Sequence, residues 1–273
     1  MTKYFVGIDS GSTMCKTVLF DGKSVVDYQN VKTGWNPELS ARKSLGFLLE
    51  GNGLCRDDVC VSATGYGREA LDFADYAFTE ITCHAFGAMS LMSDIAGVID
   101  IGGQDSKVIQ IRDKKIVNFL MNDKCAAGTG RFFSMASETL DVSLDDIDKF
   151  ADQNEAIPIN SMCTVFAESE IIGSLAMQKD RSKIMTGVLQ SIAQKIWQMT
   201  GKLDFADGKP LLMTGGLSRS KLLMSIISQT IGLEVISHEY ALFAGATGAC
   251  ICAENRQSLK IPNSALEVVG RKT

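Results

Sequence analysis

Near the start of the chain stands the stretch Tyr4-Phe5-Val6-Gly7-Ile8-Asp9-Ser10-Gly11-Ser12-Thr13-Met14-Cys15-Lys16-Thr17-Val18-Leu19-Phe20, which decides the fold. Apolar and β-branched residues flank the short polar segment 9–13 on both sides. Such a pattern is typical of a strand, a tight turn and a second strand. The sequence therefore predicts a β-hairpin over residues 4–20.

The same design recurs at Gly97 to Ile111. Sliding the first copy along by 91 residues superposes three pairs of polar or glycine positions: Asp9 on Asp100, Gly11 on Gly102 and Lys16 on Lys107. Repeated units of this length indicate an internal duplication. We therefore predict two domains of like topology, residues 1–94 and 95–273, with the C-terminal segment a candidate to pack back on the first domain.

Helical and extended segments alternate between and after the hairpins, which predicts an α/β fold. Residues 184–197 carry apolar side chains four apart and predict a core helix. Glycines at 215 and 216 predict a turn after a strand, and Gly232 a helix end. The other expected elements are a helix over Pro37–Leu49, a strand over Cys60–Thr64, a strand over Leu211–Thr214, and a helix over Lys221–Thr230 with Ser218 as its N-cap.

Composition excludes several classes of protein. Lys and Arg total 27 against 32 Asp and Glu, so the net charge of −5 lacks the basic surplus that nucleic-acid binding needs. The start of the chain has no long apolar run of the kind found in signal peptides. The longest uncharged apolar stretch, Tyr240 to Ala253, is shorter than the roughly 20 residues of a membrane helix. We expect a cytoplasmic protein that binds neither nucleic acid nor membrane.

The two glycine turns have the chemistry of phosphate loops. In residues 9–13, Gly11 lets backbone N–H groups of the turn approach an anion, Ser12 and Thr13 add hydroxyls, and Asp9 suits a magnesium shell. Residues 100–105 supply a second such loop, in which Gly102 and Gly103 are followed by an amide and a carboxylate. Asp100, Gln104 and Asp105 could hold the waters of Mg²⁺ and orient an attacking water.

Three segments together resemble a known superfamily: Gly7-Ile8-Asp9-Ser10-Gly11-Ser12-Thr13, Asp100-Ile101-Gly102-Gly103-Gln104-Asp105-Ser106-Lys107 and Thr214-Gly215-Gly216. They are similar to the phosphate-1, phosphate-2 and adenosine motifs of the actin, sugar-kinase and Hsp70 ATPases. The resemblance implies two ribonuclease-H-like domains that close on Mg-ATP in the cleft between them. Gly215 and Gly216 would then carry the adenosine side of the nucleotide.

Two cysteine segments narrow the resemblance: Lys124-Cys125-Ala126-Ala127-Gly128-Thr129-Gly130-Arg131-Phe132 and Met162-Cys163-Thr164-Val165-Phe166-Ala167-Glu168-Ser169-Glu170. They are similar to the segments that hold the iron-sulfur cluster in activator ATPases of 2-hydroxyacyl-CoA dehydratases, relatives of the benzoyl-CoA reductase ATPase subunits. A four-iron cluster takes four thiolates. The resemblance therefore implies a homodimer in which Cys125 and Cys163 of each subunit hold one shared 4Fe-4S cluster.

This resemblance implies an oxygen-sensitive protein of anaerobic metabolism that donates electrons at the expense of ATP. An electron from ferredoxin or flavodoxin would pass to a 2-hydroxyacyl-CoA dehydratase or a related iron-sulfur reductase, such as a double-cubane-cluster protein. Were each cluster cysteine to begin a helix, the positive helix end would favour its thiolate.

Two other functions stay open on the residues alone. One is a small-molecule kinase of the same fold, with Asp105 as general base and the cysteines merely packed. The other is a nucleotide-dependent assembly protein with negligible hydrolysis. Lys16 and Lys107 could neutralise phosphate or face solvent. The remaining cysteines (15, 55, 60, 83, 250 and 252) are interpreted as packing residues, and both histidines, His84 and His238, as structural.

Overall fold

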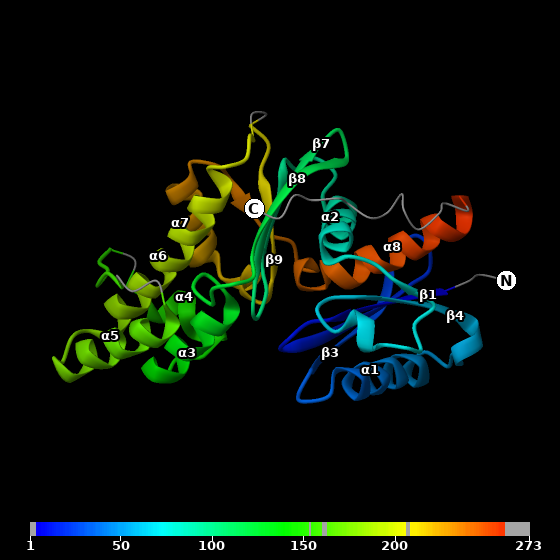
Figure 1. Cartoon of the computed structure of the whole chain (residues 1–273), viewed down its shortest axis with the longest axis horizontal. Coiled ribbons are helices and arrows are strands. Elements are labelled where there is room, and N and C mark those ends of the chain that lie inside the picture. Colours follow the sequence, from blue (N-terminus) through cyan, green and yellow to red (C-terminus); the bar gives the residue numbers. More distant parts are fainter. Residues whose placement is uncertain (1–3, 153, 160–162, 206–207, 260–273) are drawn as a thin grey trace.

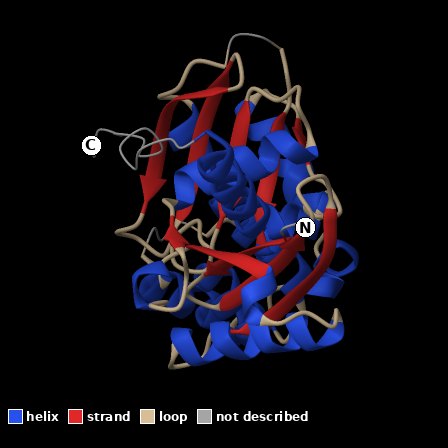
Figure 2. Ribbon diagram, turned by 90° about the vertical axis from the view of Figure 1, so that its right-hand side faces the viewer, coloured by secondary structure: helices blue, strands red, loops and turns tan. Residues whose placement is uncertain are grey.

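The computed structural model describes residues 4–152, 154–159, 163–205 and 208–259 of the 273. Two five-stranded sheets dominate it, in the strand orders β3-β2-β1-β4-β5 and β10-β9-β6-β7-β8 (Figures 1 and 2). The first sheet consists of β1 (Tyr4–Ser10), β2 (Met14–Phe20), β3 (Val25–Lys32), β4 (Val59–Thr64) and β5 (Tyr76–Ala77). The second consists of β6 (Gly97–Ile101), β7 (Ser106–Arg112), β8 (Lys115–Asn122), β9 (Leu211–Gly215) and β10 (Val235–Ile236).

The two sheets repeat one topology, which confirms the duplication. In each, the first three strands form an antiparallel meander, and the fourth strand lies parallel to the first. The register agrees residue by residue, with Asp9 opposite Lys16 and Asp100 opposite Lys107. The turns match as well, since Gly11 N donates to Met14 O as Gly102 N donates to Asp105 O.

Helices cover both faces of the first sheet because β1 is apolar on both sides. Val6 and Ile8 point to a core shared with α1 (Pro37–Gly51). Phe5 points to the opposite core, which α8 (Ala244–Leu259) completes with small residues such as Ala246. A strand buried on both faces is expected in a layered α/β fold.

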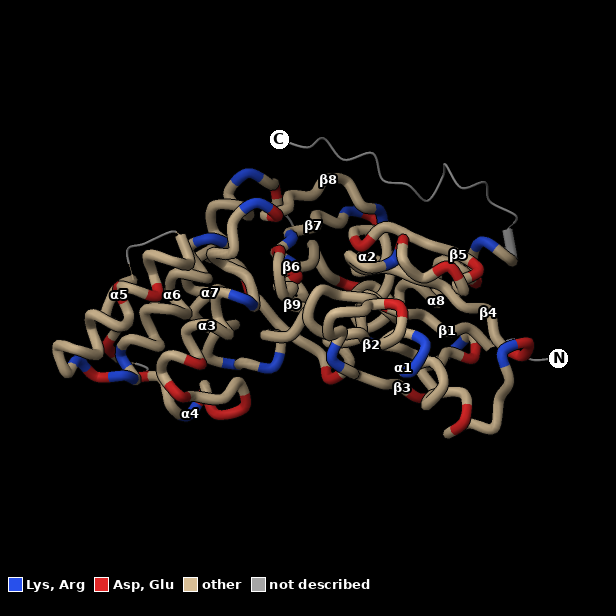
Figure 3. The backbone as a smooth tube through the Cα atoms, turned by 60° about the horizontal axis from the view of Figure 1, so that its bottom comes forward, with Lys and Arg blue, Asp and Glu red and all other residues tan. Residues whose placement is uncertain are grey.

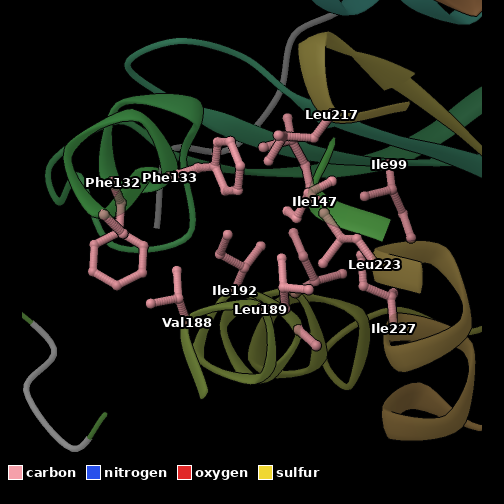
Figure 4. Close-up of a cluster of buried hydrophobic side chains, with 14 of the residues drawn as sticks. Ile99, Phe132, Phe133, Ile147, Val188, Leu189, Ile192, Leu217, Leu223 and Ile227 are labelled. Carbon is pink, nitrogen blue, oxygen red and sulfur yellow. The ribbon is translucent and has the colours of Figure 1, made fainter. Parts of the chain in front are cut away.

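The second sheet is covered in the same way. Val98 packs toward α2 (Glu80–Leu91) on one face. Ile99 packs toward the larger core on the other face, where Phe132, Leu189 and Leu223 come from three different helices (Figure 4). These helices are α3 (Gly130–Leu140), α6 (Arg181–Thr200) and α7 (Lys221–Ile231), and α4 (Ile147–Phe150) and α5 (Thr164–Ala176) add residues to the same core.

Helices α2 and α8 lie side by side between the two sheets (Figure 1). Although α2 precedes residue 94, its Ile81 and Ala85 join the core of the second sheet with Leu212. The late helix α8 covers the first sheet instead. Each sheet thus receives a helix from the other side of residue 94, and the division of the chain at that residue stays a prediction. Basic and acidic residues are interspersed over both halves (Figure 3).

The expected strands and helices are confirmed, apart from one cap. The helix α7 begins at Lys221, and its N-cap is Ser220, whose Oγ accepts from Leu223 N. The predicted cap, Ser218, is instead inside a 3-10 turn over Gly216–Arg219. Gly232 ends α7 in the left-handed conformation at φ 72°, as predicted.

Candidate functional site

The two hairpin turns open into one cavity of about 580 Å³ between the sheets. Each of the predicted catalytic and nucleotide-binding residues lines this cavity: Asp9, Gly11, Ser12, Thr13, Lys16, Asp100, Gly102, Gly103, Gln104, Asp105, Gly215 and Gly216. They come from parts of the chain as far apart as Asp9 and Gly216, so the topology alone brings them together. Cys125 and Cys163 are not among the lining residues.

The two phosphate-type loops approach each other closely. A Cβ added at Gly103 would lie 2.8 Å from Ser12 Oγ and would overlap the Thr13 hydroxyl. Glycine is therefore required where the second loop faces the first. A ligand bound at this point of the cavity would contact both halves of the molecule.

Asp9 is the carboxylate of the first loop and is buried. Its Oδ2 lies 3.0 Å from Lys16 Nζ, the residue opposite it in the β1–β2 ladder. Two glycines make room for the carboxylate: a Cβ at Gly65 would lie 2.6 Å from Asp9 Oδ1, and one at Gly245 would lie 3.0 Å from Oδ2. The ammonium group of Lys16 keeps access to the cavity, with 13% of its side chain exposed.

Lys107 occupies the equivalent place in the second sheet but has more partners. Its Nζ lies 2.7 Å from Glu80 Oε2, 2.8 Å from Asp105 Oδ1 and 3.4 Å from Asp100 Oδ2. Only 2% of its side chain is exposed, so the solvent-facing alternative for Lys107 is wrong. Sequence reasoning missed Glu80, because nothing local connects the first turn of α2 with a lysine on β7.

The carboxylates around Lys107 differ in their acidity. Burial raises the pKa of Asp105 above its usual value, and the neighbouring charge of Glu80 adds to this effect against the opposing charge of Lys107. For Asp100, burial also favours the neutral form, but His84, Lys107 and the Thr214 hydroxyl outweigh it and hold its pKa well below the usual value. Asp100 is therefore an ionised carboxylate at neutral pH.

His84 is a second residue that sequence reasoning missed. It is 4% exposed, lines the cavity, and points its Nδ1 to within 3.3 Å of Thr214 Oγ1 and 3.4 Å of Asp100 Oδ1. No motif around His84 indicates this contact, because the carboxylate neighbour comes from another strand. His238, by contrast, does not line the cavity and accepts a hydrogen bond from Tyr240 N.

The outer wall of the cavity is made by α3 and the loop after it. Here apolar side chains stand beside two carboxylates, which no motif in the sequence singles out. The lining residues of this wall are Phe133, Ser134, Ser137, Glu138, Asp141, Val142, Ser143 and Leu144, and Leu217 faces them. Apolar walls with a few polar groups are typical of the part of a pocket that holds an organic ring.

The turn at Gly215 closes the cavity from the β9 side. Gly215 has φ 86°, a left-handed conformation that favours glycine, and a Cβ there would lie 3.0 Å from Asp100 Oδ1. The same geometry recurs at Gly65, with φ 89°, after the equivalent strand of the first sheet. The duplication therefore extends beyond the two hairpins.

The helix that follows the cysteine loop is hydrogen-bonded directly to the second phosphate-type loop. The first amides of α3, those of Gly130 and Arg131, donate to the carbonyl oxygens of Gly102 and Gly103 at 2.8 Å each. Cys125 lies five residues before Gly130, in a loop held by Asn122, whose Nδ2 donates to Cys125 O at 2.8 Å. A shift of the loop at 102–103 would thus be passed to α3 and the segment before it.

The two predicted cluster cysteines differ in position. Cys163 is exposed and is the N-cap residue of α5, as the helix-start expectation required. Cys125 is half-buried and does not begin a helix, because Thr129 is the N-cap of α3. The packing interpretation holds for five of the other six cysteines, which are buried, but is wrong for Cys55, an exposed thiol that donates to Asp58 Oδ2 at 2.9 Å.

The donor chemistry of this chain fits half of a four-thiolate site. Within the described residues, no group of three or more His, Cys, Asp or Glu side chains is arranged to hold a metal ion. Two thiols from one chain cannot complete a four-iron cluster, which needs four. Two copies of the chain would supply the set.

None of the described helices combines the length and the apolar composition needed to cross a membrane.

Comparisons with known proteins agree with this architecture. The chain is 37% identical over 257 residues to the (R)-2-hydroxyglutaryl-CoA dehydratase activating ATPase of Acidaminococcus fermentans, covering 93% of this chain and 98% of that protein. The crystal structure of component A of that dehydratase superposes with a TM-score of 0.88, at 35% identity, over 94% of this chain and 99% of that one.

Two further relatives are similar. The activator of the 2-hydroxyisocaproyl-CoA dehydratase from Clostridium difficile, solved with bound ADPNP, has a TM-score of 0.86 at 33% identity, over 95% of this chain and 98% of that one. A subunit of the benzoyl-CoA reductase of Thauera aromatica is 30% identical, covering 90% of this chain and 91% of that protein. These similarities do not favour the kinase alternative.

The fold is the expected actin-like one, with two α/β halves around a cleft. The model of the BadF/BadG/BcrA/BcrD ATPase family matches residues 6–253. The chain belongs to the BadF/BadG/BcrA/BcrD ATPase family.

Proposed function

We propose that this protein is an ATP-hydrolysing activator that delivers low-potential electrons to a 2-hydroxyacyl-CoA dehydratase or a related iron-sulfur reductase. The observation that carries the proposal is the pair of backbone hydrogen bonds from Gly130 and Arg131 to Gly102 and Gly103. They connect a nucleotide cavity with the segment that bears Cys125. Nucleotide chemistry and the proposed redox centre would thereby be joined in one piece of structure.

In the cavity, the glycine loops and Lys16 would hold the phosphates of ATP. Asp9, Asp100 and Asp105 would organise Mg²⁺ and its waters, since carboxylates and water are the ligands Mg²⁺ prefers. Gln104, which is exposed at the cavity, would orient the attacking water. Lys107, already surrounded by three carboxylates, would fix Asp105 and Glu80 in position and leave phosphate binding to Lys16.

Cys125 and Cys163 of two subunits would hold one 4Fe-4S cluster on the twofold axis of a homodimer. The exposed position of Cys163 at the N-terminus of α5 supports this, since a helix N-terminus stabilises thiolates and anionic groups. Beside it, α5 exposes Val165 at 66% and Phe166 at 68%, apolar area that a second copy of the chain could cover. When bound, a cluster of this type supplies one-electron redox chemistry.

The names of the relatives, which are dehydratase activators and a part of benzoyl-CoA reductase, support the proposed electron acceptor. The electron acceptor would be an enzyme of that kind. The donor would be a ferredoxin or a flavodoxin.

The experiment is iron and acid-labile sulfide analysis of protein purified without oxygen, with its visible spectrum and its oligomeric mass. We expect about two irons per chain in a dimer, and loss of the iron in Cys125→Ser and in Cys163→Ser. Cys55→Ser is the matched control, because Cys55 is also exposed but lies in the first half of the chain. It should retain the iron.

A colourless, iron-free wild type that resists anaerobic reconstitution would contradict the electron-donor function. ATP hydrolysis without iron, together with phosphate transfer to a hydroxyl compound, would favour the kinase alternative.

A further inference from the structure

The two helices between the sheets, α2 and α8, cross at equivalent positions. A Cβ at Gly248 of α8 would overlap the carbonyl oxygen of Cys83, and a Cβ at Gly87 of α2 would overlap that of Ala244. The contacts are reciprocal. Gly87 stands four residues after Cys83, and Gly248 stands four residues after Ala244, so each helix offers a carbonyl and then a glycine to the other helix. Cys83 therefore corresponds to Ala244, and Gly87 to Gly248, about a local twofold axis.

This correspondence pairs His84 with Gly245. The two positions meet, since a Cβ at Gly245 would lie 2.8 Å from His84 Nε2. The same Cβ would lie 3.0 Å from Asp9 Oδ2. Near the local axis there is thus room for a side chain from only one of the two equivalent positions, 84 and 245. The imidazole of His84 occupies this room, and position 245 is a glycine.

The ring extends from one phosphate-type loop to the other. On its Nε2 side it reaches the neighbourhood of Asp9. On its Nδ1 side it reaches Asp100 Oδ1 and Thr214 Oγ1. The Thr214 hydroxyl donates its proton to Asp100 Oδ1 at 2.8 Å, so both oxygens facing Nδ1 are acceptors. Nδ1 therefore carries a proton, which fixes the orientation of the ring.

We propose that His84 is a positioning residue that holds the Asp100 carboxylate, by donating from Nδ1, in the orientation needed for Mg-nucleotide binding. The inference rests on the proposed nucleotide function of the cavity. His84 takes no part in bond making: its Nδ1 lies 3.4 Å from Asp100 Oδ1 and 3.3 Å from the Thr214 hydroxyl that donates to the same oxygen, and this carboxylate would contact the metal or its waters. Such outer partners orient the groups that bind the metal, and their loss costs about 10- to 100-fold in metal affinity or activity.

The alternative role of His84 is to fill space between α2 and α8. Three variants distinguish this role from the positioning role. His84→Asn retains a donor at the position of Nδ1, His84→Gln places its amide nearer the position of Nε2, and His84→Leu retains volume alone. His238→Asn is the control, because His238 lies outside the cavity. Binding of ADP would be measured by calorimetry with and without Mg²⁺, and ATP hydrolysis in parallel.

We expect the Mg²⁺ concentration for half-maximal ADP binding to rise about 10- to 100-fold in His84→Leu and His84→Gln, and less than about threefold in His84→Asn. Binding of ADP without Mg²⁺ should change little in any variant. A His84→Leu protein with wild-type Mg²⁺ dependence would overturn the inference.

Equal losses of Mg²⁺ affinity in folded His84→Asn and His84→Gln would overturn the inference too. This comparison remains available if His84→Leu does not fold. Failure of the wild type to bind or hydrolyse nucleotide would contradict the proposed function instead.

Discussion

In a Lys107→Met variant, three carboxylates lose the cation they share. Lys107 Nζ lies 2.7 Å from Glu80, 2.8 Å from Asp105 and 3.4 Å from Asp100, and the lysine side chain is 2% exposed. Methionine has a similar length but no charge. The perturbation therefore leaves the packing nearly unchanged and removes only the electrostatic partner.

The magnitude follows from burial. An exposed ion pair contributes about 0 to 1 kcal/mol, whereas removal of one partner of a buried pair costs about 3–5 kcal/mol. Lys107 is of the second kind, so we expect the free energy of unfolding to fall by about 3–5 kcal/mol at pH 7.

The stability lost in Lys107→Met depends on pH in a defined direction. The pKa of Lys107 is raised above its usual value, so its charge and its stabilising effect are complete at neutral pH and below. The pKa of Asp105 is also raised, mainly by burial. In the variant, protonation of Asp105 at lower pH removes one of the uncompensated charges. The difference between variant and wild type should therefore shrink as the pH falls from neutral.

Urea denaturation of the nucleotide-free protein would measure the effect, with Lys115→Met as the control. Lys115 is an exposed lysine at the start of β8, and its replacement should change stability by less than about 0.5 kcal/mol. A Lys107→Met protein within about 0.5 kcal/mol of the wild type, at unchanged dependence on urea, would refute the reasoning.

Two further predictions concern the helix crossing and the thiols. Gly248→Ala should lower the free energy of unfolding by about 1–3 kcal/mol in thermal or urea denaturation, because the new Cβ overlaps the Cys83 carbonyl. The cost of this overlap outweighs the gain of about 1 kcal/mol in helix propensity. Gly173→Ala, with no atom within 4 Å of the new Cβ, should be neutral or stabilising, and equal effects would contradict the packing argument. Burial raises the pKa of the Cys15 thiol to about 12, so Cys15 should resist iodoacetamide at pH 8.5 until the protein unfolds. The exposed thiol of Cys163 should react in the folded, iron-free protein. Mass spectrometry would measure the labelling, and early labelling of Cys15 would contradict the prediction.

Much of the fold could be predicted because each copy of the duplicated hairpin has a recognisable local sequence pattern. The alternation of apolar residues in 4–20 and 97–111 predicts two hairpins, and the shared offset predicts that their turns are equivalent. The exception, Ser218 in place of Ser220, concerns one turn of chain. Asp148 from α4 accepts hydrogen bonds there, from Lys221 N and the Ser220 hydroxyl. Such a long-range contact has no local signal.

The candidate site was predictable only where motif residues belong to it. The glycines and aspartates of the two loops lie in turns whose shape depends on neighbouring residues, so their roles can be inferred from sequence. Glu80 and His84 lie in an ordinary helix start, and their chemistry depends on Lys107 and Asp100 beyond the end of that helix.

The sequence by itself determined the class of fold, the two phosphate-type loops and the resemblance to activator ATPases, because these depend on short-range patterns of residue type. The tertiary structure decided which charged groups share a partner, that the helix after the cysteine loop is hydrogen-bonded to the second phosphate-type loop, and that His84 lies between Asp9 and Asp100. The shared partners and the place of His84 depend on the crossing of α2 and α8 and on the distance between the two sheets, whereas the hydrogen bonds of Gly130 and Arg131 depend on how α3 packs beside the second sheet. Packing sets all of these arrangements, and no local segment of the chain encodes them.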